Sequence, residues 1–144
     1  MRTLLVPELA PGRGSGHLRR ALRLLHSLEG ASVLVPDQTS VASLLAGVPA
    51  DRICRELGGP WDLIVVDKVV VEAEEALRLL RLAPVVGVDA GGRGRHLLDF
   101  LVDTLPRVDR TPANAAGLEF LDLPQVQGRG RERSGILITF GGED

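Results

Sequence analysis

Aromatic residues are scarce in this chain, and cysteine is almost absent. The 144 residues contain no Tyr, one Trp and three Phe, too few rings for the stacking platforms that bind single-stranded nucleic acid. The single Cys54 excludes an intramolecular disulfide framework and a cysteine-based zinc site. Three His residues without close spacing do not form a metal-binding pattern. We therefore expect neither a nucleic-acid partner nor a metal or other cofactor.

The sequence also lacks a long hydrophobic run and a strong charge of either sign. No apolar stretch approaches the roughly 18 residues of a membrane span, and the opening MRTLLVPELAPG is too weakly apolar for a secretory signal. The net charge of -2 gives no electrostatic reason to bind nucleic acid. With 44% hydrophobic and 25% charged residues, the composition is typical of a globular protein. We expect a soluble, cytoplasmic protein without a membrane span.

Short apolar runs alternate with helical patterns along the chain. Helices are predicted at His17–Leu28 and Glu72–Leu82, where apolar residues recur on one face, and a short helix at Ser40–Leu45. Strands are predicted at five apolar runs: Thr3–Val6, Ser32–Val35, Trp61–Val66, Val85–Val88 and Asp99–Val102. Continuous apolar strands that alternate with helices predict an α/β, Rossmann-like parallel sheet with helices on both faces.

A glycine loop formed by Gly14, Ser15 and Gly16 joins the first predicted strand to the first helix, which opens at His17. Ligands of parallel sheets bind outside the carboxyl ends of the strands, where this loop would lie. A helix start favours an anion or a neutral imidazole, and a general base needs the neutral form. The other interpretation is a tight turn with a solvent-facing His17. The dinucleotide fingerprint is excluded, since its third glycine would fall at Arg19.

Two aspartates end predicted strands. Asp67 follows WDLIVV and Asp89 follows VVGV, so parallel strands would bring both to the same sheet edge as His17. A carboxylate there could bind a sugar hydroxyl or orient the histidine; the alternative is an Asp that caps the next helix or turn. Arg20 lies one turn from His17 and could reach an anion, although basic helix faces are usually solvated.

The remaining candidates favour structural roles. A lone histidine such as His96 is more often structural than catalytic, and Cys54 is interpreted as a small buried apolar residue. A small nucleotide-binding regulatory domain is a further alternative, but the P-loop lysine and the third glycine are both missing.

Several segments match one known family in order and spacing across nearly the whole chain. The first is GSGHLRR, in which Gly14, Gly16, His17 and Arg20 give a G-x-G-H-x-x-R pattern. The others are DLIVVD, VVGVDA, DFLVD and ILITFGGED. On these motifs the chain resembles the N-terminal half of a GT-B glycosyltransferase-like protein. More closely, it resembles the UDP-sugar hydrolase of pseudaminic acid biosynthesis and the spore coat polysaccharide glycosyltransferases.

Three features differ from that family. No tyrosine follows Asp67, Ala90 stands in place of a second aspartate, and Asp103 stands in place of an asparagine. The chain also ends after the first strand of what would be the second domain. The resemblance therefore implies an N-terminal GT-B domain at residues 1–127, a linker at 128–135, and one strand at 136–144. The missing half, which would bind the UDP, is expected as a separate chain if the gene is split.

The resemblance also implies roles for individual residues. His17 would be the general base, with Asp67 as the second catalytic residue. The implied substrate-binding residues are Gly14, Ser15, Gly16, Arg20, Asp89, Gly141 and Gly142. The implied function is the acceptor and catalytic-base half of a UDP-sugar glycosyltransferase or hydrolase of surface polysaccharide or nonulosonic acid biosynthesis, inactive alone. The alternative is a non-catalytic Rossmann-like binding or assembly module that docks on a partner chain.

Overall fold

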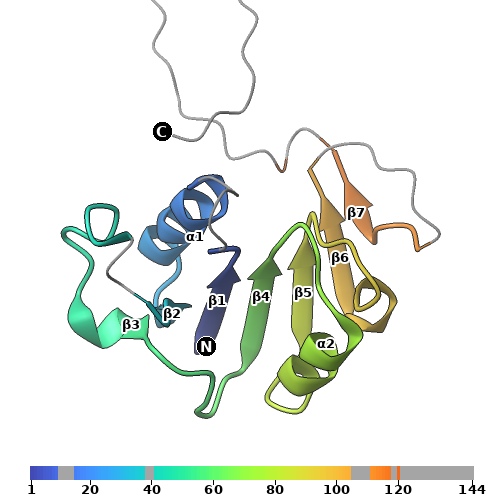
Figure 1. The fold of residues 1–144 in the computed structure, drawn as a ribbon, viewed down its shortest axis with the longest axis horizontal. Helices are drawn as coiled ribbons and strands as arrows, with labels where there is room; N and C mark the ends of the chain where they lie inside the picture. The colour runs from blue at the N-terminus through green and yellow to red at the C-terminus, as the bar shows by residue number, and fades with distance from the viewer. Residues whose placement is uncertain (10–14, 38–40, 105–110, 118–119, 121–144) are drawn as a thin grey trace, which may run out of the picture.

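A parallel β-sheet organises the chain. The computed structural model describes residues 1–9, 15–37, 41–104, 111–117 and 120. Within them, seven strands form one sheet of order β3-β2-β1-β4-β5-β6-β7, with every neighbouring pair parallel (Figure 1). The predicted α/β fold is confirmed. The predicted linker at 128–135 and strand at 136–144 lie outside the described residues.

The elements follow the predicted order with shifted ends. The strands are β1 (Thr3–Pro7), β2 (Ala31–Leu34), β3 (Ile53–Cys54), β4 (Leu63–Asp67), β5 (Val85–Val88), β6 (Phe100–Asp103) and β7 (Ala115–Ala116). The helices are α1 (Gly16–Ser27) and α2 (Ala73–Leu80), with the short 3-10 helices η2 (Ala50–Arg52) and η3 (Arg95–Leu97). None of the helices in the described part has both the length and the apolar character needed to cross a membrane.

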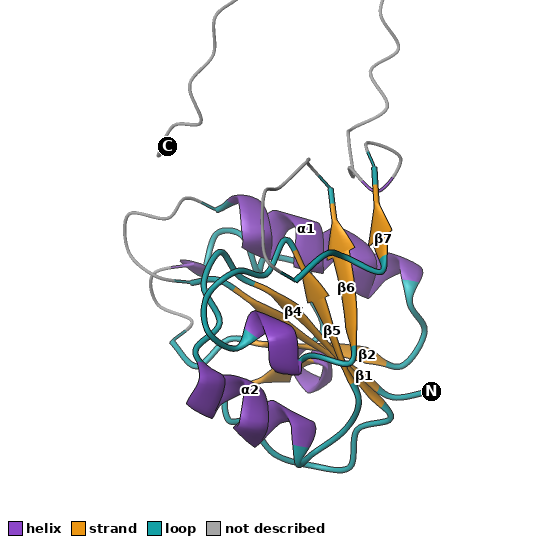
Figure 2. Ribbon diagram, turned by 90° about the vertical axis from the view of Figure 1, so that its right-hand side faces the viewer, coloured by secondary structure: helices purple, strands orange, loops and turns teal. Residues whose placement is uncertain are grey.

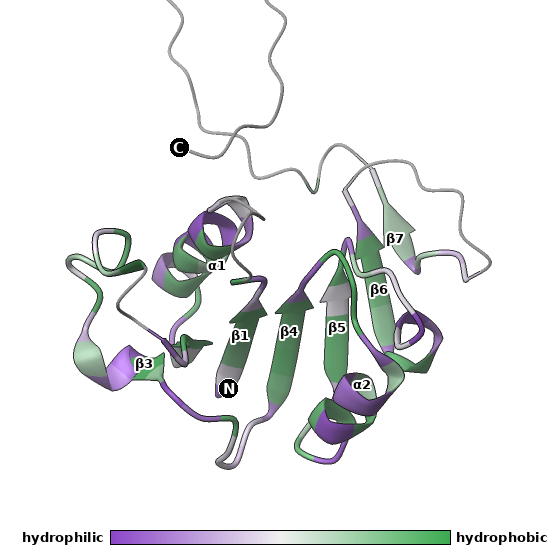
Figure 3. Ribbon diagram, viewed as in Figure 1, coloured by the Kyte–Doolittle hydropathy of each residue, from purple (hydrophilic) through white to green (hydrophobic). Residues whose placement is uncertain are grey.

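The two long helices cover opposite faces of the sheet (Figure 2). Successive side chains of a strand point to opposite faces of the sheet, so neighbouring residues of β1 belong to different core clusters. Leu4 packs in one core cluster with Ala76 of α2, and Leu5 packs in the other with Leu18 and Leu25 of α1. Figure 3 shows that the strands are mostly hydrophobic and that each long helix carries both hydrophobic and hydrophilic residues. A helix that packs against a sheet on one side and meets solvent on the other needs both.

Strand order places a topological switch point between β1 and β4. The chain leaves β1 toward β2 on one side and leaves β4 toward β5 on the other. In doubly wound sheets the connections diverge at such a point, and ligands bind there, at the carboxyl ends of the strands. Pro7 and Asp67 are the last paired residues of β1 and β4, so these two residues mark the position.

The helix predicted at Ser40–Leu45 is wrong for the residues that are described. Val41 has a 3-10 helical conformation and residues 42–47 form turns, with the amides of Leu44 and Leu45 both donating to the carbonyl of Val41; residue 40 lies outside the described part. The apolar residues have helical spacing for only one turn, which does not offset the cost of nucleating a helix. Gly47 then adopts a φ of 84° and turns the chain.

Two short strands carried no signal in the sequence. Strand β3 pairs with β2, and the carbonyl of Cys54 also accepts the amide of Val35. Cys54 packs against the core, as expected for a small apolar residue, but it is half-buried and not fully buried as predicted. Strand β7 pairs with β6 and is anchored by Asn114, whose side-chain oxygen accepts the amide of Leu101.

One face of β5 and β6 is only half covered by the described residues. Val86, Val88 and Val102 are half-buried, and Phe100 is 42% exposed. These residues lie side by side, because Val86 pairs with Phe100 and Val88 with Val102. The prediction of helices on both faces therefore holds at the centre of the sheet, whereas the described residues leave this face of β5 and β6 half covered.

Candidate functional site

Three sequence-predicted residues meet at the carboxyl ends of β4 and β5. His17 stands in the first turn of α1, Asp67 is the last residue of β4, and Asp89 follows the last residue of β5. Arg20, one turn further along α1, lies between the two aspartates and bonds to both. We call His17, Arg20, Asp67 and Asp89 the His17 cluster. The prediction that Asp67 and Asp89 share one sheet edge with His17 is confirmed.

His17 and Asp67 form a directly bonded pair. The imidazole Nδ1 lies 2.7 Å from the Asp67 Oδ1, and the two side chains are 16% and 6% exposed. An ionised carboxylate can only accept a hydrogen bond, so Nδ1 carries the proton. In the neutral imidazole Nε2 then holds the free electron pair. This is the tautomer that a histidine base needs, and Asp67 selects it.

Arg20 holds Asp67, the carboxylate of that pair, in place. Its Nε donates to Asp67 Oδ2 and its Nη2 to Asp67 Oδ1, both at 2.7 Å, while Nη1 donates to Asp89 Oδ2 at 2.9 Å. Residues three apart on a helix share a face, which is why His17 and Arg20 reach the same carboxylate. Burial alone would lower the pKa of Arg20, but the two carboxylates outweigh it and raise that pKa. The guanidinium stays charged.

Asp89 is held in an unusual backbone conformation. Its φ is 50°, and it is the one non-glycine residue of the described part in the left-handed region. Its carboxylate accepts hydrogen bonds from the amide of Thr104 at 2.7 Å and from the Thr104 hydroxyl at 2.8 Å. It also accepts the hydrogen bond from Arg20 Nη1. Burial acts to raise the pKa of Asp89, but the bonds from Thr104 and Arg20 prevail and lower it. Asp89 is therefore ionised near neutral pH.

His17 is the residue of the cluster that can take up a proton. Asp67 and Asp89 share the guanidinium of Arg20, and Asp67 also accepts the hydrogen bond from His17 Nδ1. A proton taken up at His17 Nε2 would place a positive charge beside the Asp67 carboxylate. The arrangement can therefore accept a proton from a nearby hydroxyl or water, with the resulting imidazolium stabilised by Asp67.

The glycine loop is only partly described. Gly14 lies outside the described residues, as do Gly141 and Gly142. Ser15 occupies the N-cap position of α1 without a side-chain capping bond, and its carbonyl accepts the amide of Arg19. A Cβ added at Gly16 would meet nothing within 4 Å. Crowding in the fold thus gives no reason for a glycine at this position.

The glycines after Asp89 serve packing. A Cβ at Gly92, which has a φ of 79°, would lie 2.7 Å from the carbonyl oxygen of Val71. One at Gly94 would lie 2.7 Å from the carbonyl oxygen of Glu72. The loop after β5 therefore needs glycine to lie against the loop before α2. His96, in the same segment, is exposed.

Sequence reasoning missed two parts of the site. Thr104, which binds Asp89, lies in a stretch of sequence without a periodic pattern. Arg95 ends the glycine-rich segment GGRGR, yet it is 2% exposed and donates to both carboxylate oxygens of Asp103, at 2.9 and 2.8 Å. The one signal in the sequence is the position of Asp103 directly after an apolar run, because an acid that becomes buried at a strand end needs a partner.

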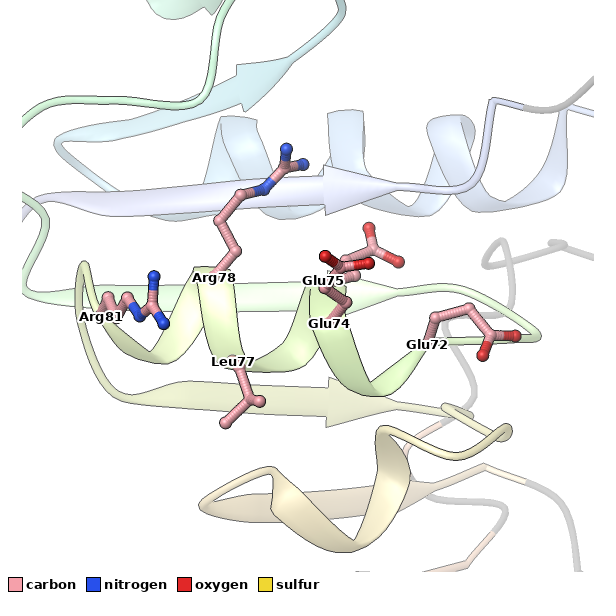
Figure 4. A pocket seen from close by; sticks show the side chains of 6 residues that line it. All are labelled: Glu72, Glu74, Glu75, Leu77, Arg78 and Arg81. Atoms are coloured by element: carbon pink, nitrogen blue, oxygen red, sulfur yellow. The ribbon is translucent and has the colours of Figure 1, made fainter.

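A shallow hollow along α2 is a separate feature (Figure 4). Its lining residues are Glu72, Glu74, Glu75, Leu77, Arg78 and Arg81. One of them, Glu75, bonds to Lys68 at 2.6 Å. None of the His17 cluster lines this hollow, and its side chains include no histidine, cysteine or hydroxyl group. Within the described residues, no group of three or more His, Cys, Asp or Glu could hold a metal ion.

The comparisons with known proteins leave the cluster as the main guide to function. No protein-family model, no curated protein and no solved structure matches this chain.

Proposed function

We propose that this chain is the acceptor-side, catalytic-base half of a nucleotide-sugar enzyme, a UDP-sugar hydrolase or glycosyltransferase. The proposal combines the family resemblance of the motifs with one observation, the 2.7 Å bond between His17 Nδ1 and the anchored carboxylate of Asp67. That bond leaves Nε2 as the proton acceptor. The pair lies at the carboxyl edge of the sheet, beside the switch point, where substrates bind in this class of fold.

The proposed step is a proton-coupled displacement at the anomeric carbon of the sugar. His17 Nε2 takes a proton from water, or from an acceptor hydroxyl, and that oxygen forms a bond to the anomeric carbon. The bond from this carbon to the UDP oxygen breaks, and UDP leaves with the electron pair. A positioned base of this kind contributes about 10²–10⁴-fold in rate. A second domain, supplied outside the described residues, would hold the UDP.

Each other residue of the cluster has a part in this step. Asp67 keeps the Nδ1–H tautomer and stabilises the imidazolium. Arg20 holds the Asp67 carboxylate in place through two hydrogen bonds. Asp89 orients Arg20. Its side chain is 23% exposed, so the carboxylate can also accept a hydrogen bond from a sugar hydroxyl.

The half-covered face of β5 and β6 favours the second candidate, a non-catalytic module that docks on a partner chain. Phe100 is 42% exposed there beside the half-buried Val86, and apolar residues grouped on a surface mark contact sites. The two candidates differ in one outcome. A docking module needs Phe100 but not His17, whereas the enzyme needs His17.

UDP release from UDP-sugars tests the proposal. The assay uses the chain together with the polypeptide that carries the UDP-binding half, and the His17→Gln variant in parallel. We expect His17→Gln to lower the rate by about 10²-fold or more, and Asp67→Asn to lower it as well. His96→Gln, at the exposed histidine, is the matched control and should leave the rate unchanged. Equal rates for the wild type and His17→Gln would refute the proposal.

A further inference from the structure

A second ion pair, between Arg95 and Asp103, has a more deeply buried guanidinium than the His17 cluster. Arg95 is 2% exposed and Asp103 is 4% exposed, and the guanidinium bonds to both carboxylate oxygens. Burying such a pair removes two charges from water, and their attraction often fails to compensate for that loss. A buried pair is therefore weak evidence for stability, and its position suggests what else it does.

The pair joins the two chain segments that flank Asp89. Arg95 Nη1 donates to the carbonyl of Ala90, the residue after Asp89, at 2.6 Å. Its partner Asp103 directly precedes Thr104, whose amide and hydroxyl both donate to Asp89. One guanidinium thus ties the segment after β5 to the end of β6, on both sides of the Asp89 carboxylate.

Asp89 has a particular need for such support. Its left-handed φ of 50° is rarely adopted by a residue with a side chain, and such conformations persist where the surroundings over-determine them. The amide of Asp89 is also fixed, because it donates to the carbonyl of Val102 at 2.9 Å. In this conformation the carboxylate lies 2.9 Å from Arg20 Nη1.

We propose that Arg95 is a positioning residue for the His17 cluster. Its guanidinium, through Ala90 and Asp103, holds Asp89 in the conformation that receives Arg20, and Arg20 in turn holds the carboxylate that orients His17. The catalytic meaning of this link rests on the proposed function. The link itself is a property of the folded chain and is measurable without substrate.

Arg95→Lys is the first test variant. Lysine keeps the charge but lacks the planar fork, so it cannot serve both Asp103 oxygens and the Ala90 carbonyl. The readout is the exchange rate with water of the Arg20 side-chain N–H protons, measured by NMR on the whole chain. We expect these protons to exchange about tenfold faster or more, the factor that corresponds to one lost charge-assisted hydrogen bond.

Arg52→Lys is the matched control. Arg52 is also an arginine that serves backbone carbonyls, with donors to Ala31, Leu25 and Leu28, but its bonds lie at the opposite end of α1 from His17. This variant should leave the exchange of the Arg20 protons unchanged. An equal effect from both variants would mean that any loss of stability loosens Arg20, and would overturn the proposal.

A double variant guards against a variant that fails to fold. Arg95→Met with Asp103→Leu replaces both charges by apolar groups, a change that buried pairs often tolerate, and it removes the link entirely. We expect the same faster exchange at Arg20. Unchanged Arg20 signals in either folded variant would overturn the proposal.

The wild-type chain provides a further measurement. If the link is rigid, the amide of Thr104, which donates to Asp89, exchanges as slowly as amides in the middle of β5; exchange as fast as in an exposed turn would overturn the proposal. All of these signals are recorded without UDP-sugar. A wild type that releases no UDP in the presence of the UDP-binding half would refute the proposed function and leave this inference to be judged on its own data.

Discussion

At the scale of single residues, the His17 cluster depends on how one carboxylate is held. Asp67 accepts hydrogen bonds from His17 and from two nitrogens of Arg20, so both of its oxygens are occupied. A carboxylate fixed in this way cannot rotate to release the imidazole. His17 is therefore oriented by contacts that the fold already makes, without help from a ligand.

Asp89 gives a prediction for the pH dependence of stability. Its pKa is lowered by Thr104 and Arg20, so the ionised form stabilises the fold above the unfolded-state value of about 3.9. This contribution is lost as the pH falls through the lower folded-state pKa. We expect Asp89→Asn to reduce the free energy of unfolding at pH 7, and the difference from wild type to shrink below about pH 4. Urea titrations at several pH values measure it; a difference that grows on acidification would contradict the assignment.

At the scale of elements, two adjacent residues of strand β6 differ strongly in solvent exposure. Leu101 is 3% exposed and lies in the core on the α2 side, whereas Phe100 is 42% exposed on the other face. The alternation of side chains along a strand explains the difference.

This contrast predicts two different costs of truncation. Leu101→Ala should lower the free energy of unfolding by about 2–5 kcal/mol, because it leaves a cavity in a packed core. Phe100→Ala should cost about 1 kcal/mol or less, as is usual for surface positions. Urea denaturation of both variants tests this. Equal costs would contradict the placement of Phe100 on an exposed face.

The loop after β5 gives a second prediction for an element. Gly92 has a positive φ, and a Cβ there would overlap the backbone of Val71, which cannot move like the end of a flexible side chain. We expect Gly92→Ala to destabilise the fold by about 1–3 kcal/mol. Gly16→Ala is the matched control, because a Cβ there meets nothing. Thermal denaturation compares them, and a harmless Gly92→Ala would contradict the packing role.

Helices and strands with a clear apolar pattern could be predicted from the sequence, whereas the buried ion pair between Arg95 and Asp103 could not. Helix α1 and strand β5 follow directly from apolar spacing, and the edge that unites His17 with Asp67 follows from parallel strand direction. Strands β3 and β7 have two residues each, too short for any period. The bond between Arg95 and Asp103 depends on tertiary packing, since nothing in a glycine-rich segment shows which arginine turns inward.

At the scale of the whole molecule, the sheet concentrates stability at its centre. Strand β1 is buried over its full length and pairs with both β2 and β4. The edge strands β3 and β7 each have one partner in the described part. The His17 cluster lies beside the central pair, so the most stable part of the fold supports it.

Hydrogen exchange measures this distribution. Amides of β1 and β4 should open only with global unfolding, whereas those of β3 and β7 should exchange through local fraying. Native-state exchange followed by NMR gives each rate. Slower exchange at β7 than at β4 would show that the β6–β7 edge is covered by something beyond the described residues.

The central claim is that Asp67 holds His17 as a base with a free Nε2. The tautomer of His17, read from the ¹⁵N shifts of its two ring nitrogens in the neutral form, tests this claim most directly. We expect the Nδ1–H tautomer in the wild type, with the exposed His96 as an internal reference. A His17 that carries its proton on Nε2, or that averages between the two tautomers, would contradict this claim.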